Sequence, residues 1–141
     1  MGLVSSTVTR ELVAEVVTRT GGPLCVPVLM RYDTADPYAI RAVFQSGDGH
    51  DVPWILGREL LTLGVHRAAG EGDVRVWPSS SSDQTVLCVV LSSPDGEALV
   101  QFAADDVVDF LCSTYSLCPR GKERDHLDMD NALRALIASR P

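Results

Sequence analysis

Three histidines are the side chains of this sequence best suited to bind a transition metal, and they stand far apart along the chain: His50, His66 and His126. Zinc sites gather ligands through short spacings such as Cys-x-x-Cys or His-Glu-x-x-His, and the sequence contains neither. The acids Asp125, Asp128 and Asp130 superficially resemble a calcium-binding loop. Such a loop also needs a glycine after its three ligands and a closing glutamate, which Asp128–Ala132 does not supply. We interpret these acids as helix-capping residues and expect no metal or other cofactor.

Four cysteines could serve as nucleophiles, as disulfide partners or as small core residues: Cys25, Cys88, Cys112 and Cys118. The N-terminal residues lack the basic region of a signal peptide, and Arg10, Glu11 and Glu15 interrupt the stretch that follows. We therefore expect a cytoplasmic protein whose cysteines are thiols that fill the core. Cys88 stands in a strongly apolar segment, where burial should raise its thiol pKa and leave it unreactive.

The glycine-rich segments do not match a phosphate-binding loop. Gly121-Lys122 has the last glycine and the lysine of a P-loop, but Ser116 stands at the position of its first glycine. Glu123 then takes the place of its serine or threonine. Gly70–Gly72 would need a third glycine where Arg75 stands in order to match a dinucleotide fingerprint. We interpret both segments as turns.

Hydrolytic chemistry has no motif either. The sequence contains no Gly-x-Ser-x-Gly elbow and no cysteine signature with a base placed to activate the thiol. Asp105, Asp106 and Asp109 could be imagined as an acid–base pair, but they lie at the start of a predicted helix, where the helix dipole favours negative charge. We therefore predict no catalytic residues and expect that the protein is not an enzyme.

Two tryptophans, Trp54 and Trp77, are candidates for binding, because tryptophan concentrates binding energy at interfaces. Packing in the core is the interpretation that we favour for both. The case for an exposed role is better for Trp77, which precedes Pro78 at the end of a predicted strand.

The formal net charge of the 141 residues is −7, and Lys122 is the only lysine. A protein that binds phosphate groups needs clustered lysine and arginine, whereas the arginines here are scattered singly among acids. Nucleic acids and anionic membranes are therefore poor partners. No apolar run approaches the roughly 18 residues that a membrane-spanning helix requires.

The elements that carry these residues follow from the apolar periodicity. Alternation and a high content of β-branched residues predict seven strands: Thr7–Thr18, Leu24–Tyr32, Ala39–Ser46, Val52–Ile55, Asp73–Trp77, Gln84–Leu91 and Glu97–Phe102. Pro27 lies within the second strand and suggests an edge position or a bulge, because proline cannot donate to a β-ladder. Pro78 and Ser79–Ser82 are predicted to form a mobile polar loop.

Helices are predicted at three places: a short one at Arg58–Leu61 that Gly64 ends, one that begins at Ala104, and one from about Leu127 to Ser139. The second should turn Val107, Val108, Leu111 and Tyr115 inward, with Phe110 at the margin of that stripe. Strands first and helices last indicate an α+β fold with an antiparallel sheet, in one domain over residues 1–141.

Several segments together resemble the SsgA-like proteins of sporulating actinomycetes. The resemblance begins in Met30–Phe44 and continues through Trp54 and Arg58–Gly64. It is strongest in Gly72–Pro78 and Leu91–Leu99, and further segments follow in the expected order at Phe110-Leu111 and Pro119–Leu127.

The resemblance implies a non-catalytic regulator of cell division and sporulation that acts through protein–protein interaction. Members of the family act in septum-site selection and septal wall assembly, and one recruits the tubulin-like ring protein FtsZ. The expected partners are therefore FtsZ or another SsgA-like protein, at division septa. The fold implied is a strongly bent antiparallel sheet with two C-terminal helices, similar to the Whirly proteins. An alternative function, taken from those proteins, is binding of single-stranded nucleic acid.

A homotrimer is the expected assembly, because the family has been associated with one. The residues add a physical reason: Thr85–Leu91 is apolar on both faces, and two short helices can cover only one face of a sheet. A closed ring of identical subunits would cover the other. We expect strand residues, rather than the acidic helix at Asp105–Asp109, to form the contact.

Overall fold

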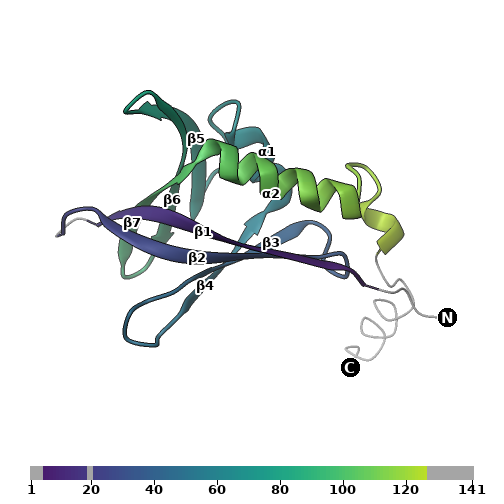
Figure 1. Cartoon of the computed structure of the whole chain (residues 1–141), viewed down its shortest axis with the longest axis horizontal. Helices are drawn as coiled ribbons and strands as arrows, with labels where there is room; N and C mark the ends of the chain where they lie inside the picture. The colour runs from purple at the N-terminus through teal and green to yellow at the C-terminus, as the bar shows by residue number, and fades with distance from the viewer. Residues whose placement is uncertain (1–4, 19–20, 127–141) are drawn as a thin grey trace.

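In a computed structural model, which describes residues 5–18 and 21–126, seven antiparallel strands form one sheet with the order β4-β3-β2-β1-β7-β6-β5 (Figure 1). The strands are β1 (Thr7–Thr18), β2 (Leu24–Asp33), β3 (Ala39–Phe44), β4 (Val52–Gly57), β5 (Val74–Ser81), β6 (Gln84–Ser93) and β7 (Gly96–Ala103). The helices are α1 (Arg58–Gly64), α2 (Ala104–Leu117) and a 3₁₀ turn, η1 (Glu123–His126).

The sheet curls strongly into a half-barrel, and α2 lies across its concave face (Figure 1). The predicted α+β fold with a strongly bent antiparallel sheet is confirmed. Helix α1 joins the two edges of the sheet, because it follows β4 directly and contacts β5. The second C-terminal helix, predicted from Leu127 to Ser139, lies outside the described residues.

The core lies between the concave face and the two helices. Alternate residues of the strands point into it, among them Val28, Met30 and Tyr32 of β2. Helix α2 contributes Val107, Phe110 and Leu111, which are all at most 5% exposed. The prediction for α2 was wrong at two positions, because Phe110 is buried whereas Val108 is 36% exposed. The i, i+3, i+4 spacing that starts at Val107 sets the buried face, and Val108 falls outside it.

The loop predicted at Pro78 and Ser79–Ser82 is wrong, since β5 continues to Ser81. Ser79 pairs with Val86, so the apolar and β-branched residues of β6 hold the serines in the sheet. Ser82 and Asp83, with φ of 50° and 66°, form the two-residue turn that suits a tight hairpin. Pro78 is tolerated because β5 is an edge strand.

Pro27 lies neither in an edge strand nor at a bulge, contrary to the prediction. Strand β2 lies between β1 and β3, and Pro27 stays in register opposite Val13. The carbonyl of Pro27 accepts a hydrogen bond from the backbone N–H of Gln45 at 2.9 Å, so the missing N–H also faces the β3 side. Pro27 and Gln45 stand next to the end of the β2–β3 pairing at Val28, so the proline leaves out only the reciprocal bond to Gln45.

Candidate protein-interaction surfaces

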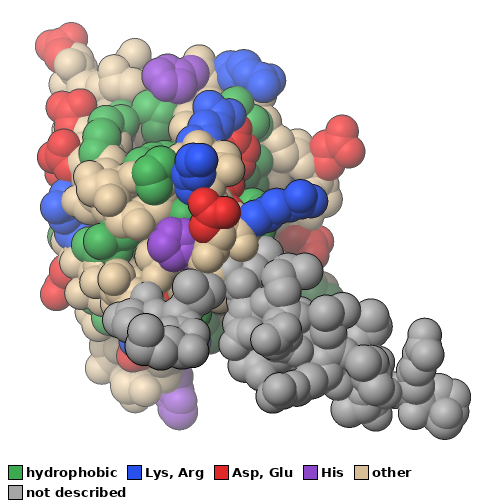
Figure 2. All heavy atoms as spheres, turned by 90° about the vertical axis from the view of Figure 1, so that its right-hand side faces the viewer, with side chains coloured by type: hydrophobic (Ala, Val, Ile, Leu, Met, Phe, Trp, Pro, Cys, Tyr) green, Lys and Arg blue, Asp and Glu red, His purple; other side chains and the backbone are tan. Residues whose placement is uncertain are grey.

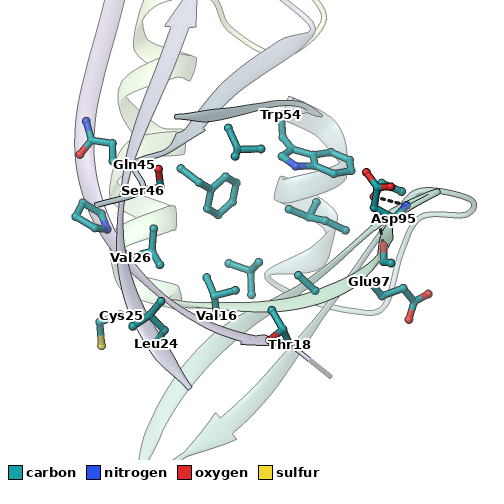
Figure 3. A pocket seen from close by; sticks show the side chains of 18 of the residues that line it. Val16, Thr18, Leu24, Cys25, Val26, Gln45, Ser46, Trp54, Asp95 and Glu97 are labelled. Carbon is teal, nitrogen blue, oxygen red and sulfur yellow. Dashed lines mark hydrogen bonds between the residues drawn. The ribbon is translucent and has the colours of Figure 1, made fainter. Parts of the chain in front are cut away.

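The concave face of the half-barrel has a covered half and an open half. Helix α2 leaves β7 at Ala104 and runs toward the end of the sheet at which β1 begins (Figure 1). The other end of the concave face holds a cavity of about 1420 Å³, which we call the trough. Its apolar lining comes mainly from Val16, Val26, Phe44, Trp54, Leu91 and Val100 (Figure 3).

The alternation of the strands positions these side chains. Val16 of β1 pairs with Val100 of β7, and both continue the concave-face row to which the buried Ala14 and Phe102 belong. Val26 stands two residues before Val28 on the same face of β2. The trough is thus the apolar face of the same sheet beyond the reach of α2.

Asp95 and Glu97 are the acids among the described residues that line the trough, and Asp95 is in the turn between β6 and β7 (Figure 3). The loop between β3 and β4, whose Ser46 and Gly47 also line the trough, carries Asp48 and Asp51. The side chain of Ser46 and the backbone N–H of His50 donate hydrogen bonds to Asp48, which lowers the pKa of its carboxyl group and keeps it ionised. No lysine or arginine is among the described residues that line the trough.

Glu97 is the one acid near the trough that already has a basic partner. Its carboxylate lies 3.5 Å from the guanidinium of Arg75 and accepts a hydrogen bond from Ser92 at 3.0 Å. Both partners are exposed, so the pair contributes little to stability. It does reduce the charge that Glu97 offers, and Asp95 is the other acid among the described residues that line the trough.

A second apolar surface lies on the convex face of the sheet, which we call the convex row. Its most exposed members are Val13 at 61% and Ile55 at 59%. The register of β1 to β4 places four further apolar residues on the same face, Pro27, Leu29, Val43 and Pro53, with Glu11 opposite Leu29 and Arg41 opposite Ile55. An apolar surface of this extent across four strands is typical of a site that contacts another protein.

Arg58 holds the end of α2 in place over the covered half of the concave face. It is 2% exposed, and its guanidinium donates to the backbone carbonyl oxygens of Thr114 at 3.3 Å and Cys118 at 2.8 Å. These carbonyls end α2, where the helix dipole attracts a cation. The guanidinium also lies 3.4 Å from the carboxylate of Glu123 and 4.1 Å from the ring centroid of Tyr115.

Tyr32 completes this cluster from the sheet. Its ring centroid lies 4.9 Å from the guanidinium carbon of Arg58, and its hydroxyl donates to the carbonyl of Pro37 at 3.0 Å. Burial raises the pKa of the Tyr32 hydroxyl, so it stays neutral. Sequence reasoning recognised Arg58 as part of a short helix but missed its role. No motif or spacing in Arg58–Gly64 signalled it.

The metal-ligand candidates do not come together. Within residues 5–18 and 21–126, no group of three or more His, Cys, Asp or Glu side chains is arranged to hold a metal ion. Asp125 lies in η1, whereas Asp128 and Asp130 are outside the described residues. Gly70, Gly72 and Gly121 all have positive φ, which confirms the turns. Asp105 and Asp106 are exposed in the first turn of α2, as predicted, and Asp109 is exposed farther along that helix.

The cysteines divide into two pairs. Cys88 and Cys118 are buried, which confirms the packing role predicted for them, whereas Cys25 and Cys112 are exposed, so the same prediction was wrong there. Burial raises the pKa of the Cys88 thiol, although a contact from the Gln101 amide at 3.7 Å acts in the opposite direction. All four are free cysteines.

Both tryptophans are half-buried, but they lie on opposite faces of the sheet. Trp54 points into the trough (Figure 3), whereas Trp77 pairs with Cys88 on the convex side. Packing accounts for only part of each side chain. The sequence favoured Trp77 for an exposed role, and the structure gives the better binding position to Trp54.

The face seen from the end at which α2 finishes has basic and acidic side chains interspersed, with no single basic patch in view (Figure 2). Among the helices that the structure describes, none is long and apolar enough to cross a membrane.

The chain is similar to proteins of cell division. Residues 26–123 match the family model described as Streptomyces sporulation and cell division protein, SsgA. The sporulation-specific cell division protein SsgB of Streptomyces coelicolor is 46% identical over 134 residues, which cover 95% of this chain and 98% of that protein. The SsgB of Frankia casuarinae is 43% identical over 134 residues, covering 95% and 94%.

Two solved structures have the same fold. An SsgB structure, reported with mutations that correlate with longitudinal cell division during sporulation of Streptomyces coelicolor, has a TM-score of 0.84 at 45% identity. It covers 89% of this chain and 99% of that one. The crystal structure of an SsgA-like sporulation-specific cell division protein from Thermobifida fusca has a TM-score of 0.85 at 38% identity, with 96% and 98% covered.

Proposed function

The chain belongs to the SsgA family of sporulation and cell division proteins, and we propose that it acts in septation by binding other proteins and not by catalysis. The observation that carries this proposal is the open trough, an apolar cavity of about 1420 Å³ to which α2, among the described helices, does not extend. Burial of apolar surface drives most protein association, and a large exposed apolar concavity is typical of a binding site.

The partners that we propose are FtsZ or another SsgA-like protein, at division septa. Relatives are named sporulation-specific cell division proteins, so the partner should belong to the division machinery. Binding of single-stranded nucleic acid is not proposed, because the net charge of −7 repels phosphates.

The convex row supports the proposal that the protein is also a homo-oligomer, with three as the preferred number. Val13 and Ile55 lie on strands and are more than half exposed, so the contact would use strands and leave the acidic start of α2 free. An obligate interface buries about 2,000 Å² or more and is apolar at its centre. Light scattering should report a multimer for the full chain, and a V13E/I55E variant should be monomeric.

Binding to purified partners tests the main proposal. The full chain, immobilised on a biosensor, should bind purified FtsZ or a purified SsgA-like paralogue with a Kd on the order of 10 µM or tighter. Neither partner binding at about 100 µM would refute it. The matched control is serum albumin, which is also acidic and should give no signal.

A further inference from the structure

We propose that the trough receives an amphipathic helix of a partner protein, apolar on one face and flanked by lysine or arginine. This inference rests on the proposed function, because it names the chemistry of the partner segment that binds. Three features support the inference: the size of the trough, the charge around it, and the charge on the exposed side of α2, which a second copy of this chain would present.

The size of the trough suits a helix better than a small molecule. Pockets for small ligands usually measure roughly 300–1,000 Å³, whereas the trough holds about 1420 Å³. The trough is open on one side, so it can receive one face of a helix of about 12 residues, which is roughly 18 Å long and 10 Å wide. Helices bind such grooves through apolar residues on one face, and the partly exposed Val16, Val26, Phe44 and Trp54 provide the matching wall.

The charge at the rims selects a basic helix. Asp95 lines the trough from the turn between β6 and β7, and the loop whose Ser46 and Gly47 line the opposite side also carries Asp48 and Asp51. The floor between them has no ionisable side chain with a positive charge among the described lining residues. Lysine or arginine at the ends of a bound helix would lie near these acids, which raises the association rate and discriminates against acidic segments.

The exposed helix of this chain is the wrong occupant for a second copy. The free side of α2 carries Asp105, Asp106 and Asp109, and like charges would oppose those acids at the rims. Within its own subunit, α2 is fixed over the other half of the sheet by Arg58. Helix α2 of a second copy is therefore disfavoured, and we assign the trough to a segment from a different protein.

The two tryptophans provide a reporter for the test, because the chain has only two and one of them is in the trough. In a Trp77→Phe variant of the full chain, all tryptophan emission comes from Trp54. A bound apolar helix should shift that emission to the blue and saturate. In the matched Trp54→Phe variant, emission from Trp77 on the other face should not change.

The probes are designed 14-residue peptides with one leucine face and either lysine or glutamate at both ends. The lysine peptide should bind with a Kd on the order of 10 µM and at least about tenfold more tightly than the glutamate peptide. The preference should shrink in high salt, because the rim charges are exposed. In variant D51N/D95N the lysine peptide should bind several-fold more weakly, and in the control D105N/D106N its affinity should be unchanged.

An apolar control separates the trough from the rest of the surface. Val26→Glu places a charge on the wall of the trough and should abolish the shift, whereas Val108→Glu on the exposed side of α2 should leave it intact. Circular dichroism should show both variants folded. If Val26→Glu does not fold, Val26→Thr should weaken binding at least threefold.

Three results would overturn the inference. They are equal binding of the two peptides, a shift from Trp77 in place of Trp54, or stronger binding of a peptide with the sequence of residues 127–140. The last result would make the trough a self-association site. If the protein binds neither FtsZ nor a paralogue but still prefers the lysine peptide, only the proposed function is wrong. If it binds one of these proteins but does not prefer the lysine peptide, only the inference about the trough is wrong.

Discussion

The two halves of the concave face are built from the same strands with the same alternation, yet α2 covers one half and leaves the other open. Over the half near the start of β1, α2 buries Phe110 and Leu111 against the sheet, and Arg58 fastens the end of the helix. Over the half near Val16 and Val26, the apolar wall faces an open cavity. The covered half holds the buried contacts of α2, and the open half is the one that we propose binds a partner.

Thiol reactivity should show the largest difference between the halves. Cys25 is exposed at the rim of the trough, whereas Cys118 is fully buried at the end of α2. Cys118 can react only when the covered half opens, and opening at a cost of about 4 kcal/mol or more slows labelling by at least about 1,000-fold. Mass spectrometry after pulses of a maleimide measures both rates. In denaturing urea the two thiols should react alike, and similar rates in the native protein would mean that α2 covers nothing.

Loss of a side chain under α2 should be the largest change in stability. Replacing Phe110 by Ala removes a ring that is 1% exposed and should lower the free energy of unfolding by about 3–5 kcal/mol. The matched control is Val108→Ala on the same helix, which should cost less than about 1 kcal/mol because that side chain is 36% exposed. Urea denaturation measures both. Equal losses would contradict the packing of α2.

Arg58→Met tests the fastening of α2. The variant keeps the apolar length of the side chain but leaves Glu123 and the carbonyls at the end of α2 without their partner. Breaking a buried charge network from one side costs about 3 kcal/mol, so the variant should lose that much free energy of unfolding. Adding Glu123→Gln to it should restore part of the loss. If the double variant is no more stable than Arg58→Met, the ion pair does not contribute.

Local pattern was enough to predict the strands and the covered face in outline, because alternation depends only on neighbours in the sequence. The exceptions have a common cause in distant contacts. The serines of β5 stay in the sheet because β6 pairs with them, which composition does not reveal. Arg58 bonds to groups 56 and 60 residues away, and no spacing signals such a contact.

The trough could not be predicted for a related reason. Its residues are ordinary strand residues, and what makes them a site is the direction in which α2 leaves β7. Nothing in the sequence of α2 states that direction, because it depends on how the helix packs against the whole curled sheet. The sequence therefore predicted that Trp54 packs in the core, although it stands at the margin of the core.

The smallest expected effect comes from a comparison of Val26 with Val28, which stand two residues apart on the same face of β2. Val28 is 0% exposed beneath the covered half, and Val28→Thr should cost about 1–2 kcal/mol because the new hydroxyl would be buried. Val26 lines the trough and is half-buried, and Val26→Thr should cost less than about 0.5 kcal/mol because water can solvate the hydroxyl there. The two variants have the same change of shape and strand propensity. The difference between their losses of unfolding free energy, measured by urea denaturation, therefore reports how far each side chain is covered. Equal costs would mean that the wall of the trough is already buried in the isolated protein, and the division into a stabilising half and a binding half would then be wrong.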